Sequence, residues 1–109
     1  MKKGVIRVEA NPNIGLGHAT RAISLCEMLL PEASIAIAFR DMPEKTKQEF
    51  IKLGCDLICL DKISTSDEYS HTKRITGKID FVIVDGYSFL DTFKKDTKSC
   101  GDKLVLIDD

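Results

Sequence analysis

No tryptophan occurs in this 109-residue sequence, and its net charge is only -1, because 16 basic residues nearly balance 17 acidic ones. A chain with this balance has no basic field that would attract nucleic acid or an anionic membrane surface, so we expect neither as a partner. The sequence also has no apolar run near the roughly 20 residues that a membrane-spanning helix needs. The basic start at Lys2 and Lys3 is not followed by a signal-peptide cleavage site. These absences predict a cytoplasmic protein without a membrane span.

The cysteines also lack the spacing of a metal or redox site. Cys26, Cys55, Cys59 and Cys100 form no paired C-x-x-C pattern, and no histidines lie at zinc-ligand intervals from them. Each falls in a segment whose pattern indicates an apolar helix face or a strand. We therefore expect reduced, buried thiols and no metal site. The composition, 43% hydrophobic and 30% charged, is typical of one globular domain with a modest core.

Strand patterns recur along the whole chain. They cover residues 4–10, 33–39, 56–60, 79–84 and 103–107. The run at 33–39 is almost continuously small or β-branched, as in a parallel strand that is covered on both faces. Because helical patterns separate the strands, the sequence predicts right-handed βαβ crossovers. The expected fold class is α/β, a Rossmann-like doubly wound parallel sheet of five strands in the order 3-2-1-4-5.

Helical patterns occupy residues 18–30, 44–53 and 89–97, and a third, between the last two, follows a loop of capping residues at 64–67 and extends to residue 77. For the second helix, Asp41 is the expected capping residue and Gly54 the expected stop. The third helical segment has only Tyr69 and Ile75 as sizeable apolar anchors. Its helical pattern is accordingly the weakest of the set.

A glycine-bearing loop, NPNIGLGHATR at residues 11–21, connects the first strand to the first helix. Gly15 and Gly17 would permit positive φ angles and close approach of the backbone to a phosphate or sugar oxygen. The pattern is G-x-G without a third glycine, and no ribose-binding acidic residue is evident near the end of the second strand. Dinucleotide binding is therefore disfavoured, and an ordinary tight turn remains the alternative to an anion site.

The first turn of the first helix also carries two residues that could act in catalysis or in binding. His18 would lie beside the positive end of the helix dipole, which favours its neutral form and suits a general base. Its alternative role is capping or packing at the helix start. Arg21 lies on the same side of the helix and could hold a phosphate or carboxylate with its planar guanidinium group. Its alternative is an ordinary surface arginine.

Other candidate residues should lie at the same edge of the sheet. The predicted strand order places the switch point between the first and fourth strands, so Asp85 and Tyr87 would approach His18. Asp85 could orient the histidine, accept from a sugar hydroxyl or cap the next helix. Tyr87 could contact a ligand or pack at the edge of the core. Arg7 and Glu9 could equally pair with neighbours across the sheet or serve a ligand.

Several short patterns resemble one known family. They are R-V-E-A-N, N-I-G-L-G-H-A-T-R, A-F-R-D, F-V-I-V-D-G-Y and L-V-L-I-D-D, and together they span essentially the whole chain. They are similar to the amino-terminal domain of the UDP-sugar hydrolase family of pseudaminic acid biosynthesis, of the spore-coat polysaccharide type. The resemblance implies a glycosyltransferase-like GT-B architecture. Residues 1–109 would be its amino-terminal Rossmann-like half, and the family's carboxyl-terminal nucleotide-binding domain is absent from them.

The resemblance also implies a reaction. Family members hydrolyse a UDP-2,4-diacetamido-trideoxyhexose by inverting water attack at the anomeric carbon, without a metal or cofactor. The catalytic residue would be His18. The substrate-binding residues would be Gly15, Gly17, Arg21, Asp85, Tyr87 and Glu9. Glu9 stands where the family usually has aspartate, and Gly86 where it often has histidine.

The partners implied are a UDP-sugar substrate and a second GT-B domain, in cis or in trans. The full-length family member would be an enzyme, whereas this half alone is expected to be inactive. The alternative is a non-catalytic sugar-nucleotide-binding or partner domain. A receiver-like or flavodoxin-like domain shares the strand order, but Glu9 and Asp108 at its strand ends do not fit a receiver site.

Overall fold

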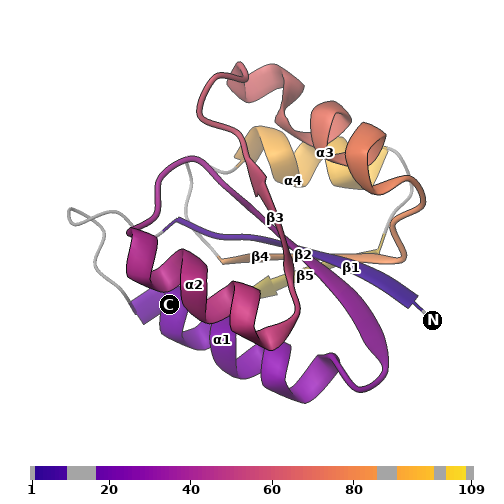
Figure 1. Ribbon diagram of the computed structural model, residues 1–109. Helices are drawn as coiled ribbons and strands as arrows, with labels where there is room; N and C mark the ends of the chain where they lie inside the picture. Colours follow the sequence, from indigo (N-terminus) through magenta and orange to yellow (C-terminus); the bar gives the residue numbers. More distant parts are fainter. Residues whose placement is uncertain (1, 10–16, 86–90, 100–102, 108–109) are drawn as a thin grey trace.

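The computed structural model describes residues 2–9, 17–85, 91–99 and 103–107, and Figure 1 shows the arrangement of their helices and strands. Strands and helices alternate throughout, as the sequence predicts. In chain order they are β1 (Lys2–Arg7), α1 (Gly17–Leu29), β2 (Ala33–Phe39), α2 (Glu44–Leu53), β3 (Asp56–Cys59), the 3-10 helix η1 (Thr65–Asp67), α3 (Glu68–Thr76), β4 (Phe81–Asp85), α4 (Asp91–Ser99) and β5 (Lys103–Ile107).

The five strands form one parallel sheet in the order β3-β2-β1-β4-β5, which confirms the predicted topology. Connections from β1 to β3 run one way across the sheet, and those from β3 to β5 run the other way. With crossovers of one hand, this reversal places α1 and α2 on one face and α3 and α4 on the other (Figure 1). The order changes direction between β1 and β4, so the carboxyl ends of these strands form the switch point.

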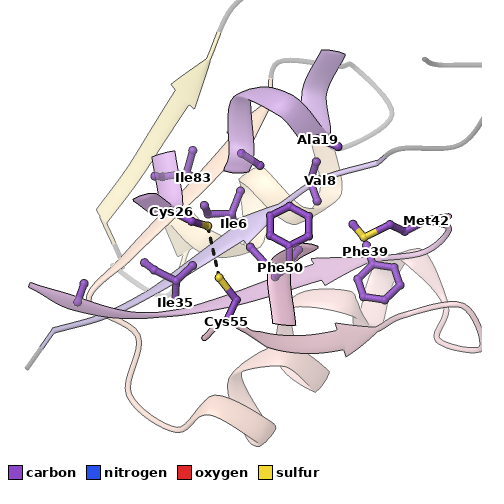
Figure 2. Packing of buried hydrophobic residues seen from close by; sticks show 13 residues of the cluster. Ile6, Val8, Ala19, Cys26, Ile35, Phe39, Met42, Phe50, Cys55 and Ile83 are labelled. Carbon is purple, nitrogen blue, oxygen red and sulfur yellow. Dashed lines mark hydrogen bonds between the residues drawn. The ribbon is translucent and has the colours of Figure 1, made fainter. Parts of the chain in front are cut away.

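Side chains alternate between the two faces and build two apolar layers. On the side of α1 and α2 the buried cluster includes Ile6, Val8, Ala19, Ala22, Cys26, Ile35, Ile37, Phe39 and Phe50 (Figure 2). On the side of α3 and α4 it includes Val5, Ala36, Ala38, Ile58, Tyr69, Val82, Val84 and Phe93. In this second layer the rings of Tyr69 and Phe93 lie with their centroids 5.6 Å apart. The sheet is therefore covered on both faces.

A close contact inside the sheet explains why residue 4 is a glycine. Gly4 of β1 pairs with Phe81 of β4, and the Phe81 ring covers the position where a side chain of Gly4 would stand. A Cβ atom built on Gly4 would lie 2.2 Å from Cζ of Phe81. Since real Cβ atoms do not approach other atoms so closely, glycine allows the aromatic ring to lie flat against the central strand.

The ends of α2 confirm one sequence prediction and correct another. Gly54 has φ of 92°, and its N–H donates to the carbonyl oxygen of Ile51 at 3.0 Å, which makes it the helix stop as predicted. The expected capping role of Asp41 is wrong. Pro43 occupies the N-cap position of α2, which begins at Glu44, and no side-chain cap hydrogen bond is made there.

Two burial predictions are also wrong. Cys59 is exposed, because β3 is a four-residue edge strand in which only Ile58 is fully buried. Ile75 is 58% exposed, because α3 buries Glu68, Tyr69 and Thr72 instead. Cys26 and Cys55 are buried as expected, and Cys100 lies outside the described residues. The longest described helix, α1, has 13 residues, and none of the described helices combines the length and apolar character needed to cross a bilayer.

Candidate functional site

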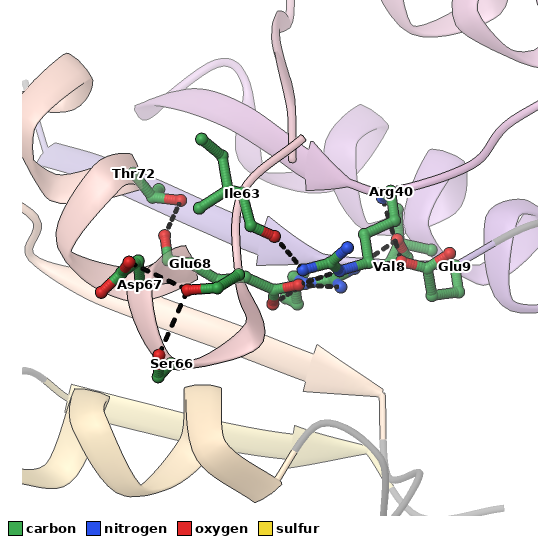
Figure 3. Close-up of polar contacts among 10 residues, drawn as sticks. Val8, Glu9, Arg40, Ile63, Ser66, Asp67, Glu68 and Thr72 are labelled. Atoms are coloured by element: carbon green, nitrogen blue, oxygen red, sulfur yellow. Dashed lines mark hydrogen bonds and ion pairs between the residues drawn. The ribbon is translucent and has the colours of Figure 1, made fainter. Parts of the chain in front are cut away.

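Four charged side chains meet at the carboxyl edge of the two central strands β1 and β2 (Figure 3). Arg7 is the last residue of β1, and Glu9 follows two residues later. Arg40 directly follows β2, and Glu68 is the first residue of α3. Segments that are distant in sequence therefore converge in one group, which we call the charged cluster: Arg7, Glu9, Arg40 and Glu68.

Arg7 lies at the centre of the charged cluster. Its side chain is 1% exposed. Its Nε and Nη2 atoms donate to the two carboxylate oxygens of Glu68, at 3.1 and 3.2 Å. Its Nη1 atom donates to Oε1 of Glu9 at 2.6 Å and to the carbonyl oxygen of Val8 at 3.0 Å. The guanidinium group thus joins the end of β1 to the start of α3 through a bidentate pair.

Glu9 and Arg40 extend the cluster to the end of β2. Oε1 of Glu9 accepts from Arg7 and also from the backbone N–H of Arg40, at 3.0 Å. The Arg40 side chain donates from Nε to Glu68 and from Nη2 to the carbonyl oxygen of Ile63. Arg40 is 30% exposed, whereas the side chains of Arg7, Glu9 and Glu68 are between 1% and 6% exposed. Arg40 is therefore the member that solvent or a ligand can reach most easily.

The charge balance explains why these side chains can be buried. Two guanidinium groups face two carboxylates, so each ion has a partner within hydrogen-bonding distance. Moving an isolated ion out of water is very costly, and pairing largely offsets that cost without adding much net stability. Removing one member would leave the remaining charges buried without an opposite charge that offsets the cost of taking them out of water. The cluster consequently fixes the geometry of this edge more than it stabilises the fold.

The sequence was compatible with either pairing or ligand binding for Arg7 and Glu9, and in the structure they are paired. Arg40 and Glu68 were not predicted as their partners. One available signal was the position of Arg7, which lies on the same face of its strand as Val5, toward the buried layer beside α3 and α4. A charged residue there requires an opposite charge, and α3 has few apolar residues but an acidic residue at its start.

The glycine turn is described only at Gly17, and one expectation about it is wrong. Gly17 is already the first residue of α1 and does not have a positive φ; among the described glycines, that conformation occurs at Gly54 and Gly77. A Cβ atom on Gly17 would meet no described atom within 4 Å. Among the described residues, therefore, nothing requires glycine at this position.

The structure describes only some of the other predicted site residues. His18 is the second residue of α1, and Asp85 is the last residue of β4, so both backbones lie at the carboxyl edge of the sheet. Gly15, Tyr87 and the side chains of His18 and Asp85 lie outside the described part of the chain. Arg21 is half-buried on α1, across the sheet from α3 and the charged cluster. It borders a shallow apolar hollow of about 280 Å³ formed along that helix.

Metal binding has no support in the described coordinates, and the predicted lack of a metal stays a prediction. Within residues 2–9, 17–85, 91–99 and 103–107, no group of three His, Cys, Asp or Glu side chains is arranged to hold an ion. What the described edge offers is a set of guanidinium and carboxylate groups beside a helix start. Such groups can hold phosphate or hydroxyl groups and orient them by hydrogen bonds.

Comparison with known proteins gives structural matches only. No protein-family model and no curated protein matches the sequence. The apo structure of UGT2 from Phytolacca americana superposes with a TM-score of 0.66 at 11% identity, over 99% of this chain and 29% of that one. A UGT transferase from Siraitia grosvenorii in complex with UDP gives a TM-score of 0.67 at 13% identity, over 96% of this chain and 27% of that one. Both are GT-B proteins.

The chain has the fold of one GT-B domain. This confirms the predicted Rossmann-like class and the glycosyltransferase-like architecture. The chain spans 29% and 27% of the two similar structures, so it corresponds to less than a third of either. At 11% and 13% identity the likeness concerns the fold, and activity has to be argued from the residues of this chain.

Proposed function

We propose that this chain is the amino-terminal, histidine-bearing half of a GT-B nucleotide-sugar hydrolase. Its substrate would be a UDP-2,4-diacetamido-trideoxyhexose used in surface polysaccharide or pseudaminic acid biosynthesis in the cytoplasm. The observation that carries this proposal is that α1 begins with Gly17 and His18, directly after I-G-L in the sequence and at the carboxyl edge of a GT-B-like sheet. Support also comes from a similar structure that was determined in complex with UDP.

In this proposal His18 is the general base. A neutral imidazole at the start of a helix can accept a proton from water, and the helix dipole disfavours its charged form. The water oxygen then forms a bond to the anomeric carbon as the bond from that carbon to the phosphate oxygen breaks. The proton moves to His18, UDP leaves as an anion, and the configuration of the sugar is inverted.

The remaining predicted residues would hold the substrate. Backbone N–H groups near Gly15 and Gly17 would support the sugar or the departing phosphate, and Arg21 would contribute positive charge. Asp85 would orient His18 or accept from a sugar hydroxyl, with Tyr87 beside it. Glu9 has Oε1 engaged by Arg7 and Arg40, so we assign Oε2 to the sugar. The charged cluster then keeps that carboxylate in one orientation.

A second GT-B domain, in cis or in trans, completes the proposed enzyme. It would bind most of the nucleotide across a cleft from the carboxyl edge of this sheet. On this basis the isolated chain should bind UDP-sugar weakly and should not release UDP. Addition of the second domain should restore both properties.

The decisive experiment measures UDP release by the complete protein and by its His18→Ala variant. We expect the variant to lose about 100-fold to 10,000-fold in turnover, the usual contribution of a general base. His71→Ala is the matched control, because His71 lies on α3 and is the other histidine of the chain. Unchanged turnover in His18→Ala would eliminate the proposed base. UDP binding without any release by the wild-type protein would favour the alternative, a non-catalytic sugar-nucleotide-binding or partner domain.

A further inference from the structure

Two buried cysteines face each other in the apolar layer beside α1 and α2, far from the charged cluster. Cys26 belongs to α1, and Cys55 lies in the turn between α2 and β3. Their Sγ atoms are 3.5 Å apart, within hydrogen-bonding distance (Figure 2). Cys26 is 0% exposed and Cys55 is 7% exposed. The pair is therefore enclosed, with Cys55 as its outer member.

The backbone holds both thiols in this arrangement. Cys26 lies on the core-facing side of α1, among the buried residues of the first apolar layer. Cys55 follows Gly54, whose left-handed conformation ends α2, and the N–H of Cys55 donates to the carbonyl oxygen of Phe50 at 3.1 Å. Since a helix face and a capped turn fix the two Cα positions, the sulfur atoms meet as a consequence of the fold.

The contact also separates the acidities of the two thiols. The pKa of Cys55 is lowered because a hydrogen bond from the Cys26 thiol stabilises the Cys55 thiolate, although burial opposes this effect. The pKa of Cys26 is raised, first by the same hydrogen bond and then by burial. Cys55 is thus the thiolate that forms first, and a thiolate is the nucleophilic form of cysteine.

We propose that Cys26 and Cys55 are an oxidation site that forms a disulfide with hydrogen peroxide as the oxidant. The Cys55 thiolate attacks one peroxide oxygen, the O–O bond breaks, and Cys55 becomes a sulfenic acid while hydroxide takes a proton to form water. The Cys26 sulfur then attacks the Cys55 sulfur. The S–S bond forms as the S–O bond breaks, and the oxygen leaves as a second water. Two thiols and one peroxide give one disulfide and two waters.

The disulfide would tie α1 to the start of β3. The two cysteines are 29 positions apart in sequence, so the bond would close a loop that includes all of β2 and α2. Bond formation requires the sulfur separation to shorten from 3.5 Å to about 2.05 Å. A bond across such a loop restricts the unfolded chain and so raises the melting temperature.

Peptide mass spectrometry tests the proposal in the chain itself. The folded protein is treated with hydrogen peroxide, alkylated after denaturation and digested with trypsin without reduction. Cys26 then lies in the peptide 22–40, whereas Cys55 and Cys59 share the peptide 53–62. We expect a cross-linked pair of these peptides that separates on reduction. The same treatment should raise the melting temperature by about 10 °C.

Matched variants decide which cysteine is used. Cys59→Ala, at the exposed cysteine of the same peptide, should keep the cross-link and the rise in melting temperature. Cys55→Ala and Cys26→Ala should each lose both; two variants are used in case one of them does not fold. A cross-link that survives in Cys55→Ala, or peroxide treatment that leaves Cys26 and Cys55 free to be alkylated in the wild-type chain, would overturn the proposal. None of these readouts depends on nucleotide-sugar hydrolysis.

Discussion

The two faces of the sheet are held by different interactions. On the side of α1 and α2 the buried cluster is apolar and includes Phe50 and the paired thiols. On the side of α3 and α4 a smaller apolar layer adjoins the charged cluster, with Arg7 and Glu68 fully enclosed. Apolar contacts are non-directional and respond gradually to changes in volume, whereas buried ions require specific partners. The apolar layer beside α1 and α2 therefore stabilises the fold, whereas the charged cluster on the other face fixes the geometry of the carboxyl edge of the sheet.

The composition of α3 explains why the second face uses charge. Its sequence, EYSHTKRIT, buries only one large apolar side chain, Tyr69, because Ile75 is exposed. Apolar burial alone would leave several helix positions along the sheet similarly favourable. The bidentate pair between Arg7 and Glu68 selects one of them, since it joins a fixed point of β1 to the first residue of the helix. This assigns to the buried pair a role in selecting the position of α3 on the sheet.

The largest effect is expected for Arg7→Met. Methionine keeps much of the side-chain length but leaves Glu9 and Glu68 buried without their common partner. We expect the free energy of unfolding to fall by about 3–5 kcal/mol, measured by urea denaturation. Phe50→Leu is the matched change on the other face, at a side chain that is 0% exposed, and should lower it by less than about 1.5 kcal/mol. Equal losses in the two variants would remove the distinction between the faces.

A smaller loss is expected for Gly4→Ala on the α1 side of the sheet. The added Cβ would stand 2.2 Å from the Phe81 ring, so the ring must move out of its place against β1. Overpacking of this kind lowers the free energy of unfolding by about 1–3 kcal/mol. Thermal or urea unfolding measures it. Phe81→Leu should make Gly4→Ala much less harmful in the double variant, and strictly additive losses would contradict the proposed clash.

At the carboxyl edge, Gly17→Ala should stabilise the isolated chain slightly. Gly17 does not have a positive φ, and a Cβ atom there would meet no described atom within 4 Å, so we expect alanine to reduce the freedom of the unfolded chain, a gain of about 0.5 kcal/mol. In the complete protein the same methyl group should weaken UDP-sugar binding, because the proposed ligand approaches the backbone there. Urea unfolding and calorimetric titration measure the two effects. Unchanged affinity would argue against that approach.

The smallest effect is expected for the partly exposed Asp80, at the amino edge of the sheet. Oδ2 of Asp80 accepts from the backbone N–H of Lys3 at 2.8 Å, which is the main reason that the pKa of Asp80 is lowered below 3.8. A lowered folded-state pKa contributes stability above the unfolded value, and this is lost as the pH falls through the folded value. Asp80→Asn should therefore reduce the loss of stability between pH 7 and pH 3, as measured by urea unfolding.

The salt dependence of this effect identifies its cause. Salt weakens the attraction of Asp80 to Lys78 and Lys2 but leaves a direct hydrogen bond largely intact. The difference between wild type and Asp80→Asn should consequently persist in 1 M salt. Its disappearance there would assign the pH dependence to the lysines.

Periodicity and the alternation of strands with helices were sufficient to predict the strand order and to place the strands and helices to within a few residues. The strands at 33–39 and 103–107 have the predicted limits, because turn residues surround short apolar runs. Two predictions from local sequence failed. Asp41 is a good capping residue, but Pro43 occupies the N-cap position of α2 and no side-chain cap hydrogen bond forms. Ile75 is apolar, but the buried side of α3 carries Glu68, Tyr69 and Thr72.

Less of the site could be predicted. The sequence pointed to Arg7 and Glu9 but could not choose between ligand and partner, since that choice depends on residues 61 positions away in the chain. Glu68 and Arg40 appeared as ordinary charged residues, because a single sequence does not reveal which charges are buried. The roles of His18, Gly15, Arg21, Asp85 and Tyr87 stay predictions. The order of the strands, by contrast, already indicated the edge at which such residues meet.

The central position of β1 has a consequence for how the protein is made. β1 precedes the other four strands of the sheet in the sequence, yet it pairs with β2 on one side and β4 on the other, and the Lys3 to Asp80 contact spans 77 residues. On a ribosome, β1 cannot gain its second neighbour until β4 has emerged, and Arg7 cannot gain its Glu68 partner until the start of α3 has emerged. Contacts that join such distant segments slow folding. The central strand β1 is therefore the strand with the longest interval between its own synthesis and the pairing of both its edges.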